Sequence, residues 1–258
     1  MARRGVIVIQ VAISVSLVAL AIAASLSFKL RLERDLMIAT LRALVQMVGV
    51  AYLIHLVFDS LALTGIGLAV MASAATWTSA RRLKGVPHSF ELALVSISSG
   101  TLVSFAILFG AGVFPLEPQW MIPIAGMLIG NTMIVTSLAG ARIRDEVVDK
   151  TLEVEARLAL GVPAKEAMRG YVRRAATAAM IPIVDTTKNV GLIHLPGAFV
   201  GMMLGGAEPL EAAKVQLIVL FMLLGAVAVS GITTAVLAAR SFVAPGERIA
   251  VPAGARAY

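Results

Sequence analysis

Seven apolar segments of about 20 residues or more constrain the fold of this chain more than any other feature. A helix of that length crosses about 30 Å of hydrocarbon at 1.5 Å per residue, and in lipid only a helix satisfies the backbone of a single segment. Charged residues make up 14% of the chain, against about a quarter in soluble domains. We therefore predict an all-α, polytopic membrane helix bundle of about seven transmembrane helices. The predicted spans are 5–28, 36–58, 61–80, 90–114, 119–141, 178–204 and 213–239.

The first span has some features of a secretory signal peptide. Arg3 and Arg4 precede an apolar run, and residues 23–25 are as small as those of a cleavage site. The run is too long for the core of a signal, however, and basic residues follow it at once. We therefore retain it as a helix that stays in the protein.

The positions of the basic residues predict the orientation. If the N-terminus lies outside, the inner segments are 29–35, 81–89, 142–177 and the stretch from 240 onward, and they hold 17 of the 22 Lys and Arg residues. Basic residues prefer cytoplasmic loops, so we predict an outside N-terminus and a cytoplasmic loop between spans five and six. The net charge of +7 is explained by these loops, and we expect no nucleic-acid partner.

Several kinds of site are missing from the sequence. The chain has no cysteine, which excludes a disulfide framework and a thiolate metal site. It has no phosphate-binding Gly-x-x-x-x-Gly-Lys run, so it cannot hydrolyse ATP in the P-loop manner. We expect no catalytic residue, no metal site and no cofactor bound by this chain. Residues 1–244 are predicted to form a single transmembrane domain, and 245–258 a flexible cytoplasmic tail.

The loop 142–177 is the only long charged segment. From 146 to 160 its apolar residues recur at near-helical spacing, Gly161 then breaks the pattern, and Pro163 suits the first turn of a second helix. The sequence thus predicts a helix, a glycine turn and a helix at the membrane surface. Two interpretations remain open, an amphipathic helix held by anionic lipid and a coupling element docked in another protein.

A family resemblance favours the second interpretation. Glu155-Ala156 followed by Gly161 resembles the EAA-type loop of ABC-transporter permeases. In that family the short helix beside the glycine sits in a groove of the ATPase subunit. The resemblance therefore implies that Glu155, Ala156, Gly161, Val162 and Pro163 couple this chain to an ATPase.

The sixth span resembles one family in particular. Residues 190–197 read Val-Gly-Leu-x-x-Leu-Pro-Gly, and residues 204–212 read Leu-Gly-Gly-x-x-Pro-x-x-Ala. Together with 122–131 and 42–46 they resemble the Fet-type iron-export permeases, and still more the branch with the plant aluminium-tolerance permeases. The chain departs from the iron exporters at Asp185 and Lys188, where that branch is neutral and polar.

This resemblance implies a function. The chain would be the membrane subunit of an ABC transporter, working as a homodimer with ATPase subunits that bind ATP and Mg²⁺. It would lie among the lipids of a bacterial inner membrane. Iron or another metal is the first candidate substrate, and a nucleotide-sugar, implied by the aluminium-tolerance branch, is the second. An intramembrane enzyme with a site at Asp185, Lys188 and His194, and a non-transporting scaffold, are the rival interpretations.

Polar residues within the spans suggest a substrate path. We expect Asn131 to form a hydrogen bond between helices, and Asp185 to pair with Lys188 or with Arg42. The alternative is a basic vestibule for an anionic or chelated substrate. His194 could pass a soft metal, although a lone histidine is more often a core residue. The predicted path comprises Arg42, Gln46, Asn131, Asp185, Lys188, Asn189 and His194.

Glycines spaced by four allow helices to approach closely. Two such sets occur, one in span five and one in span six, where Pro196 also weakens the helix. Static packing and a sliding gate are both consistent with this spacing. The predicted packing or gating residues are Gly126, Gly130, Pro196, Gly197, Gly201 and Gly205.

Overall fold

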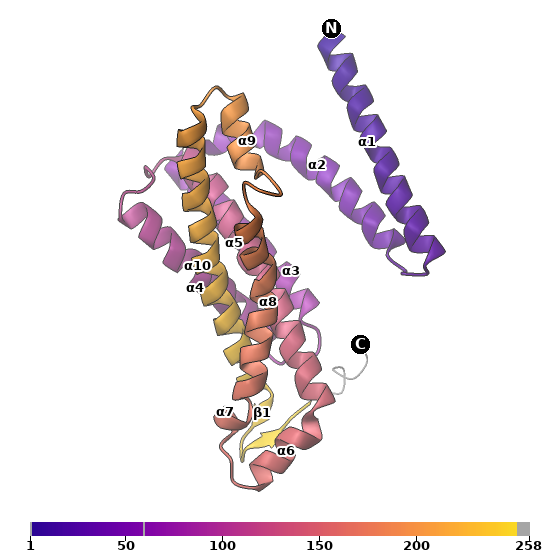
Figure 1. Ribbon diagram of the computed structural model, residues 1–258, viewed down its shortest axis with the longest axis vertical. Helices are drawn as coiled ribbons and strands as arrows, with labels where there is room; N and C mark the ends of the chain where they lie inside the picture. The colour runs from indigo at the N-terminus through magenta and orange to yellow at the C-terminus, as the bar shows by residue number, and fades with distance from the viewer. Residues whose placement is uncertain (1, 59, 252–258) are drawn as a thin grey trace. The chain divides into compact units, whose positions relative to one another are not determined.

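The computed structural model describes residues 2–58 and 60–251, and the chain divides into two compact units, Met1–Asp59 and Ser60–Tyr258 (Figure 1). The first unit is a helical hairpin of α1 (Ala2–Ser27) and α2 (Glu33–Phe58). Ser25 is buried at the turn, where its hydroxyl donates to Glu33 Oε1 at 2.8 Å and accepts from the amide of Leu32 at 3.1 Å. Glu33 thereby places a negative charge at the positive end of α2.

The second unit is a bundle built around two long helices. The central α5 (Pro118–Asp149) and α10 (Pro209–Ser241) pack against each other and against both α4 (Ser89–Gly110) and α8 (Arg169–Asn189), while α3 (Leu61–Arg82) packs on α4 and α5 (Figure 1). Each of the two central helices begins with proline, which lacks the amide that would be unpaired in the first turn.

The interior of this bundle is closely packed and contains small hydroxyl residues. Thr136 of α5 and Ser230 of α10 share a hydrogen bond of 2.9 Å, and Thr234 donates to Thr136 at 3.2 Å. Ser79 of α3 and Ser137 of α5 lie 3.1 Å apart. Hydroxyls that pair inside the chain can be buried without a large penalty, so these pairs link the helices through the buried core.

Five of the seven predicted spans, the second to the fifth and the seventh, correspond to described helices that could cross a membrane. Five described helices are long and apolar enough to cross a membrane, and Ile13–Ser27 is a shorter apolar helix. The predicted span 178–204 is wrong as a continuous helix, because α8 ends at Asn189 and the short α9 begins only at Gly197. Gly191 has φ +80° and its amide bonds the carbonyl of His194 at 3.0 Å. This turn and Pro196 separate the two helices over residues 190–196.

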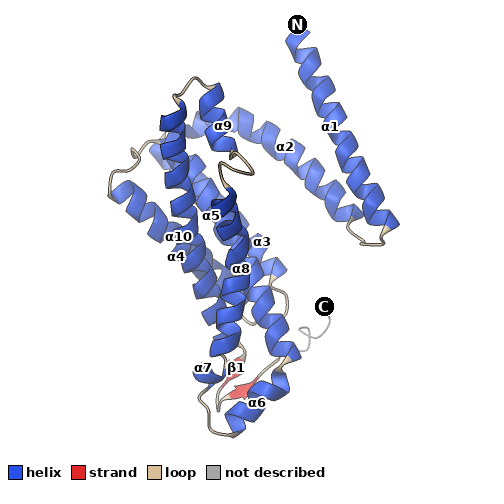
Figure 2. Ribbon diagram, in the orientation of Figure 1, coloured by secondary structure: helices blue, strands red, loops and turns tan. Residues whose placement is uncertain are grey.

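The described part of the predicted tail has a defined fold. Strands β1 (Val243–Ala244) and β2 (Arg248–Ile249) form an antiparallel hairpin (Figure 2). Ile249 and Val251 pack against the core. The remaining residues of the predicted tail, 252–258, lie outside the described residues, and the predicted single domain stays a prediction.

Candidate functional site

The charged loop begins where α5 extends beyond the end of α3. Helix α5 has 32 residues and α3 has 22, or about 48 and 33 Å. Leu83, just after α3, packs on Gly140 of α5, and Arg144 Nη1 donates to the carbonyl of Lys84 at 3.0 Å. The end of α3 thus lies beside residues 140–144, and the last turns of α5 extend beyond it.

Beyond that level the predicted helix, glycine turn and helix are confirmed. Helix α6 (Thr151–Ala159) is followed by Gly161, and the single turn α7 (Ala164–Ala167) precedes α8. Gly161 has φ +80°, and the amide of Val162 bonds the carbonyl of Arg157 at 3.1 Å. A glycine in this conformation is a common way to end a helix, and it turns the chain back towards the bundle.

Helix α6 has one buried and one exposed face. Val154 is completely buried, and α6 packs against strand β2. On the opposite face Leu152 is 82% exposed, and Glu155 and Ala156 are exposed with it. Leu160, directly after the helix, is 83% exposed. The residues predicted to couple the chain to a partner therefore lie on an outward surface that also carries two uncovered leucines.

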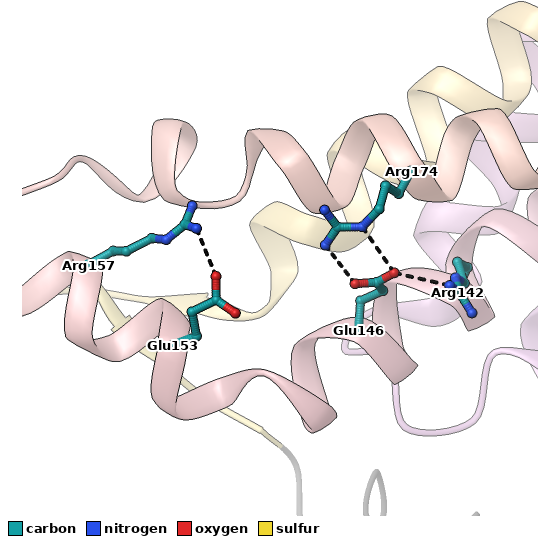
Figure 3. Close-up of polar contacts among 5 residues, drawn as sticks. All are labelled: Arg142, Glu146, Glu153, Arg157 and Arg174. Atoms are coloured by element: carbon teal, nitrogen blue, oxygen red, sulfur yellow. Dashed lines mark hydrogen bonds and ion pairs between the residues drawn. The ribbon is translucent and has the colours of Figure 1, made fainter.

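Charged pairs fix this loop to the bundle (Figure 3). Arg174 of α8 donates to both oxygens of Glu146 on α5, at 2.8 and 3.3 Å, and Arg142 lies 3.2 Å from the same carboxylate. The hydrogen bond from Arg174, together with the charges of both arginines, lowers the pKa of Glu146 below its ordinary value. Within α6, Arg157 pairs with Glu153 at 2.8 Å.

Tyr171 joins the start of α8 to the same region. Its side chain is buried, and burial, followed by the negative charge of Glu153, raises the pKa of the Tyr171 phenol. The guanidinium of Arg174 lies over its ring, 4.8 Å from the centroid, a favourable cation–π geometry. Tyr171 and Val154 of α6 belong to the same buried hydrophobic cluster, so α6 and the start of α8 share one core.

The predicted substrate-path residues belong to both units of the chain. Arg42 and Gln46 are exposed on one stripe of α2, and the described part of that unit provides no ion pair for Arg42. Asp185 and Lys188 lie 3.9 Å apart on α8 and are 57% and 70% exposed, which favours the predicted pairing between these two.

Helix α8 ends directly after that pair. Asn189 is the last residue of α8, and His194 is exposed in the segment that follows. Among the residues that the structure describes, no three His, Asp or Glu side chains gather as metal ligands.

Two expectations about packing are corrected by the structure. Asn131 bonds the carbonyl of Met127 on its own helix at 2.9 Å, not a neighbouring helix, because its amide reaches one turn back along α5. Gly126 does pack on Met71 of α3, but a Cβ added at Gly130 would meet nothing within 4 Å.

In α9 the predicted glycine face is open. An added Cβ at Gly197 or Gly201 would meet nothing within 4 Å, and Gly205 is the residue that caps the helix. Pro196 stands just before α9, at the end of the break. Within the described part of the chain, no neighbouring helix therefore packs against Gly197 or Gly201.

One close approach between helices occurs at a glycine that the sequence analysis missed. A Cβ on Gly100 of α4 would overlap the Ala226 carbonyl oxygen of α10 and lie 2.9 Å from Ser230 Cβ. Gly100 is flanked at spacings of four by Ser96 and Ser104, both buried. Small residues at that spacing, serine included, were the available signal.

A bundle of apolar helices of this length, with its charged loop extending past the end of a neighbouring span, defines an integral membrane protein. The chain belongs to the family described as Uncharacterised protein family (UPF0014), whose model matches residues 8–243. The predicted family is thereby confirmed.

Three relatives show the range of that family. The chain is 40% identical over 211 residues to the UPF0014 membrane protein STAR2 of Oryza sativa subsp. japonica, covering 80% of this chain and 74% of that protein. It is 38% identical over 218 residues to the protein ALUMINUM SENSITIVE 3 of Arabidopsis thaliana, covering 84% and 80%. It is 33% identical over 216 residues to the probable iron export permease protein FetB of Escherichia coli (strain K12), covering 83% of each. No solved structure matches the chain.

Proposed function

We propose that this chain is the permease subunit of an ABC transporter that exports a metal ion, with iron as the first candidate. A separate ATPase subunit binds ATP and Mg²⁺, and two copies of the chain act with two ATPases. The N-terminus lies outside a bacterial inner membrane, and the loop between α5 and α8 lies in the cytoplasm. The relative named a probable iron export permease supports both the transport role and the substrate.

The observation that carries the proposal is the outward face of α6. Leu152 and Leu160 are more than four-fifths exposed at the end of the unit beyond α3, beside Glu155 and Ala156 of the EAA-like segment. Exposed leucines around a charged residue suit a surface that a protein partner covers. The buried side of the same helix meets β2 and the core.

The fixed side of α6 provides the mechanism. A closing ATPase that displaces α6 also moves α5, which directly precedes it, and α8, which the Glu146–Arg174 pair joins to α5. It moves α10 through the β1–β2 hairpin, because α6 packs on β2 and β1 follows α10. Such a partner shifts the transporter only by its different affinity for the two states. The helix pairs then alternate between inward-open and outward-open arrangements.

A charge reversal on the outward face tests the docking role. With an ABC ATPase subunit from the same organism co-expressed, Glu155→Arg is expected to weaken co-purification and permease-stimulated ATP hydrolysis by about tenfold or more, as at an interface hot spot. Glu91→Arg is the matched control, because Glu91 is 79% exposed near the start of α4. Both variants should insert in the membrane as the wild type does. Unchanged association of Glu155→Arg would refute docking at this face.

A second substrate class has its own support. The two plant relatives are more similar to this chain than the iron export permease is, at 40% and 38% identity against 33%. The aluminium-tolerance branch implies a nucleotide-sugar, so both classes belong in one screen. Reconstituted permease and ATPase should show hydrolysis stimulated by iron or another metal. Stimulation by nucleotide-sugars alone would replace the metal, and stimulation by neither would favour a non-transporting scaffold.

A further inference from the structure

A cavity opens at the end of the bundle that carries the loop, between α7, the start of α8 and the end of α10. Its volume is about 870 Å³. Lys165, Arg169 and Arg240 line it together with apolar residues, among them Val172, Val236 and Ala239. The cavity thus combines a basic part with an apolar part, which suits an amphiphilic ligand.

The three basic side chains of this cavity have no partner in the described part of the chain. No hydrogen bond or ion pair joins Lys165, Arg169 or Arg240 to another described residue, although Arg174, slightly more than one turn beyond Arg169 on α8, is paired with an acid of α5. One carboxylate, Glu166, also lines the cavity. Three bases against one acid leave an excess of positive charge that an anion would neutralise.

The depth of the cavity favours a membrane lipid as the source of that anion. Leu83, just after the 22-residue α3, packs on Gly140 of α5. We take this level as one edge of the hydrocarbon, because the length of α3, about 33 Å, matches the hydrocarbon thickness of about 30 Å. Five residues before Gly140, Val135 packs on Gly231 of α10. Arg240 lies nine residues beyond Gly231, so it stands about 6 Å past that edge. That is the level of lipid headgroups, while the apolar residues one turn earlier lie at the level of the first acyl carbons.

We propose that this cavity binds the headgroup of an anionic phospholipid, with its phosphate among Lys165, Arg169 and Arg240. The glycerol and upper acyl chain lie against Val172 and Val236. Basic pockets between transmembrane helices on the cytoplasmic side hold anionic headgroups in this way. Because Pro163 and α7 also line the cavity, the lipid steadies the segment that follows the Gly161 turn. The proposal does not depend on an ATPase partner.

The test compares lipid binding in matched variants. Purified chain in neutral detergent is titrated with phosphatidylglycerol or phosphatidylcholine, and binding is read by native mass spectrometry and by the rise in unfolding temperature. The wild type should prefer phosphatidylglycerol. Lys165→Gln/Arg169→Gln/Arg240→Gln should weaken that binding by about tenfold or more.

Two further variants separate the cavity from general charge. Arg81→Gln/Arg82→Gln/Lys84→Gln removes the same charge outside the cavity and should bind phosphatidylglycerol as the wild type does. Val236→Trp fills the cavity, keeps its charges and should weaken binding. Equal losses in the two triple variants would show mere surface attraction and overturn the site.

Two other results would also overturn the proposal. If inorganic phosphate at the same concentration protects the wild type as well as the lipid does, the cavity takes a free phosphate. If the cavity variants bind lipid normally but lose a co-expressed ATPase, the cavity is a protein-docking surface instead.

Discussion

Glycine has opposite surroundings in the core between α4 and α10 and in α9. Gly100 lies against the Ala226 carbonyl and Ser230, whereas Gly197 and Gly201 face open space. In the first region the helices of the chain itself fill the space around the glycine, because the backbones of α4 and α10 approach closely and buried hydroxyls pair beside them. The second region is not completed within the chain: α9 exposes Leu204, and the break before it exposes Leu192, at 85% and 90%. Small residues at a similar spacing therefore lie in a packed helix interface around Gly100, but on an exposed helix face in α9.

The uncovered region also contains the break in the sixth predicted span. Irregular backbone at membrane depth is tolerated where protein or water covers it, but not where it faces lipid. Residues 190–196 interrupt the path between α8 and α9, and the Asp185–Lys188 pair lies just before them. We expect the second copy of the proposed homodimer to cover this face and to leave a water-filled path beside it.

The largest effect is expected from adding a single methyl group in the closed region. Gly100→Ala should destabilise the protein by about 3 kcal/mol or more, since overpacking a core typically costs 1–3 kcal/mol and the new atom overlaps a backbone oxygen. Gly201→Ala, in the open helix, should be neutral or stabilising by up to about 1 kcal/mol. Thermal unfolding in detergent measures both. Equal effects would mean that the two glycines do not differ in packing as the structure indicates.

A smaller loss is expected from the buried hydroxyls of the same core. Thr136→Val should destabilise by about 1–3 kcal/mol, because it leaves Ser230 and Thr234 with one partner fewer. Thr186→Val is the control, since Thr186 is exposed and bonds only the carbonyl one turn back on α8. A larger effect at Thr186 than at Thr136 would indicate that the face of α8 is covered in the assembled protein.

The ion pair between Glu146 of α5 and Arg174 of α8 should contribute on the order of 1 kcal/mol to the stability of the fold. Glu146 is only 11% exposed, but Arg174 is 54% exposed, so solvent screens the pair. The pKa of the Glu146 carboxyl is lowered in the folded protein. The stabilisation from its pair with Arg174 is therefore fully present above the unfolded pKa of about 4.3, and it is lost as pH falls through the lower folded pKa. The stability difference between wild type and Glu146→Gln should thus be constant from pH 7 to 5 and shrink below about pH 4. A difference that grows on acidification would contradict the sign of this linkage.

The smallest effect on stability, but the most informative one about the open region, concerns Lys188. The chain has no cysteine, so single cysteines can be labelled without background. Lys188→Cys should react with a water-soluble maleimide in membranes, whereas Phe221→Cys, 62% exposed on α10, should react slowly because it faces lipid. If both react equally slowly, no aqueous path reaches the end of α8.

The sequence by itself determined the membrane class, the family and the form of the charged loop. Composition and the length of the apolar runs exclude a soluble fold, and Gly161 ends a helix because few other residues adopt its backbone conformation. Glu155 and Ala156 of the EAA-like pattern are exposed, and their coupling role stays a prediction. These are local or compositional properties, which do not depend on which helices become neighbours.

Only the tertiary structure decided which small residues pack and which remain open. Gly100, Gly126 and Gly201 look alike in the sequence, but the element opposite each of them differs, and a spacing rule contains no information about that element. For the same reason the sequence did not show that Asn131 bonds its own helix. Pro196 predicted only a weakened helix, whereas the structure has a non-helical segment over residues 190–196. Packing depends on two surfaces, and the sequence of one helix describes only one of them.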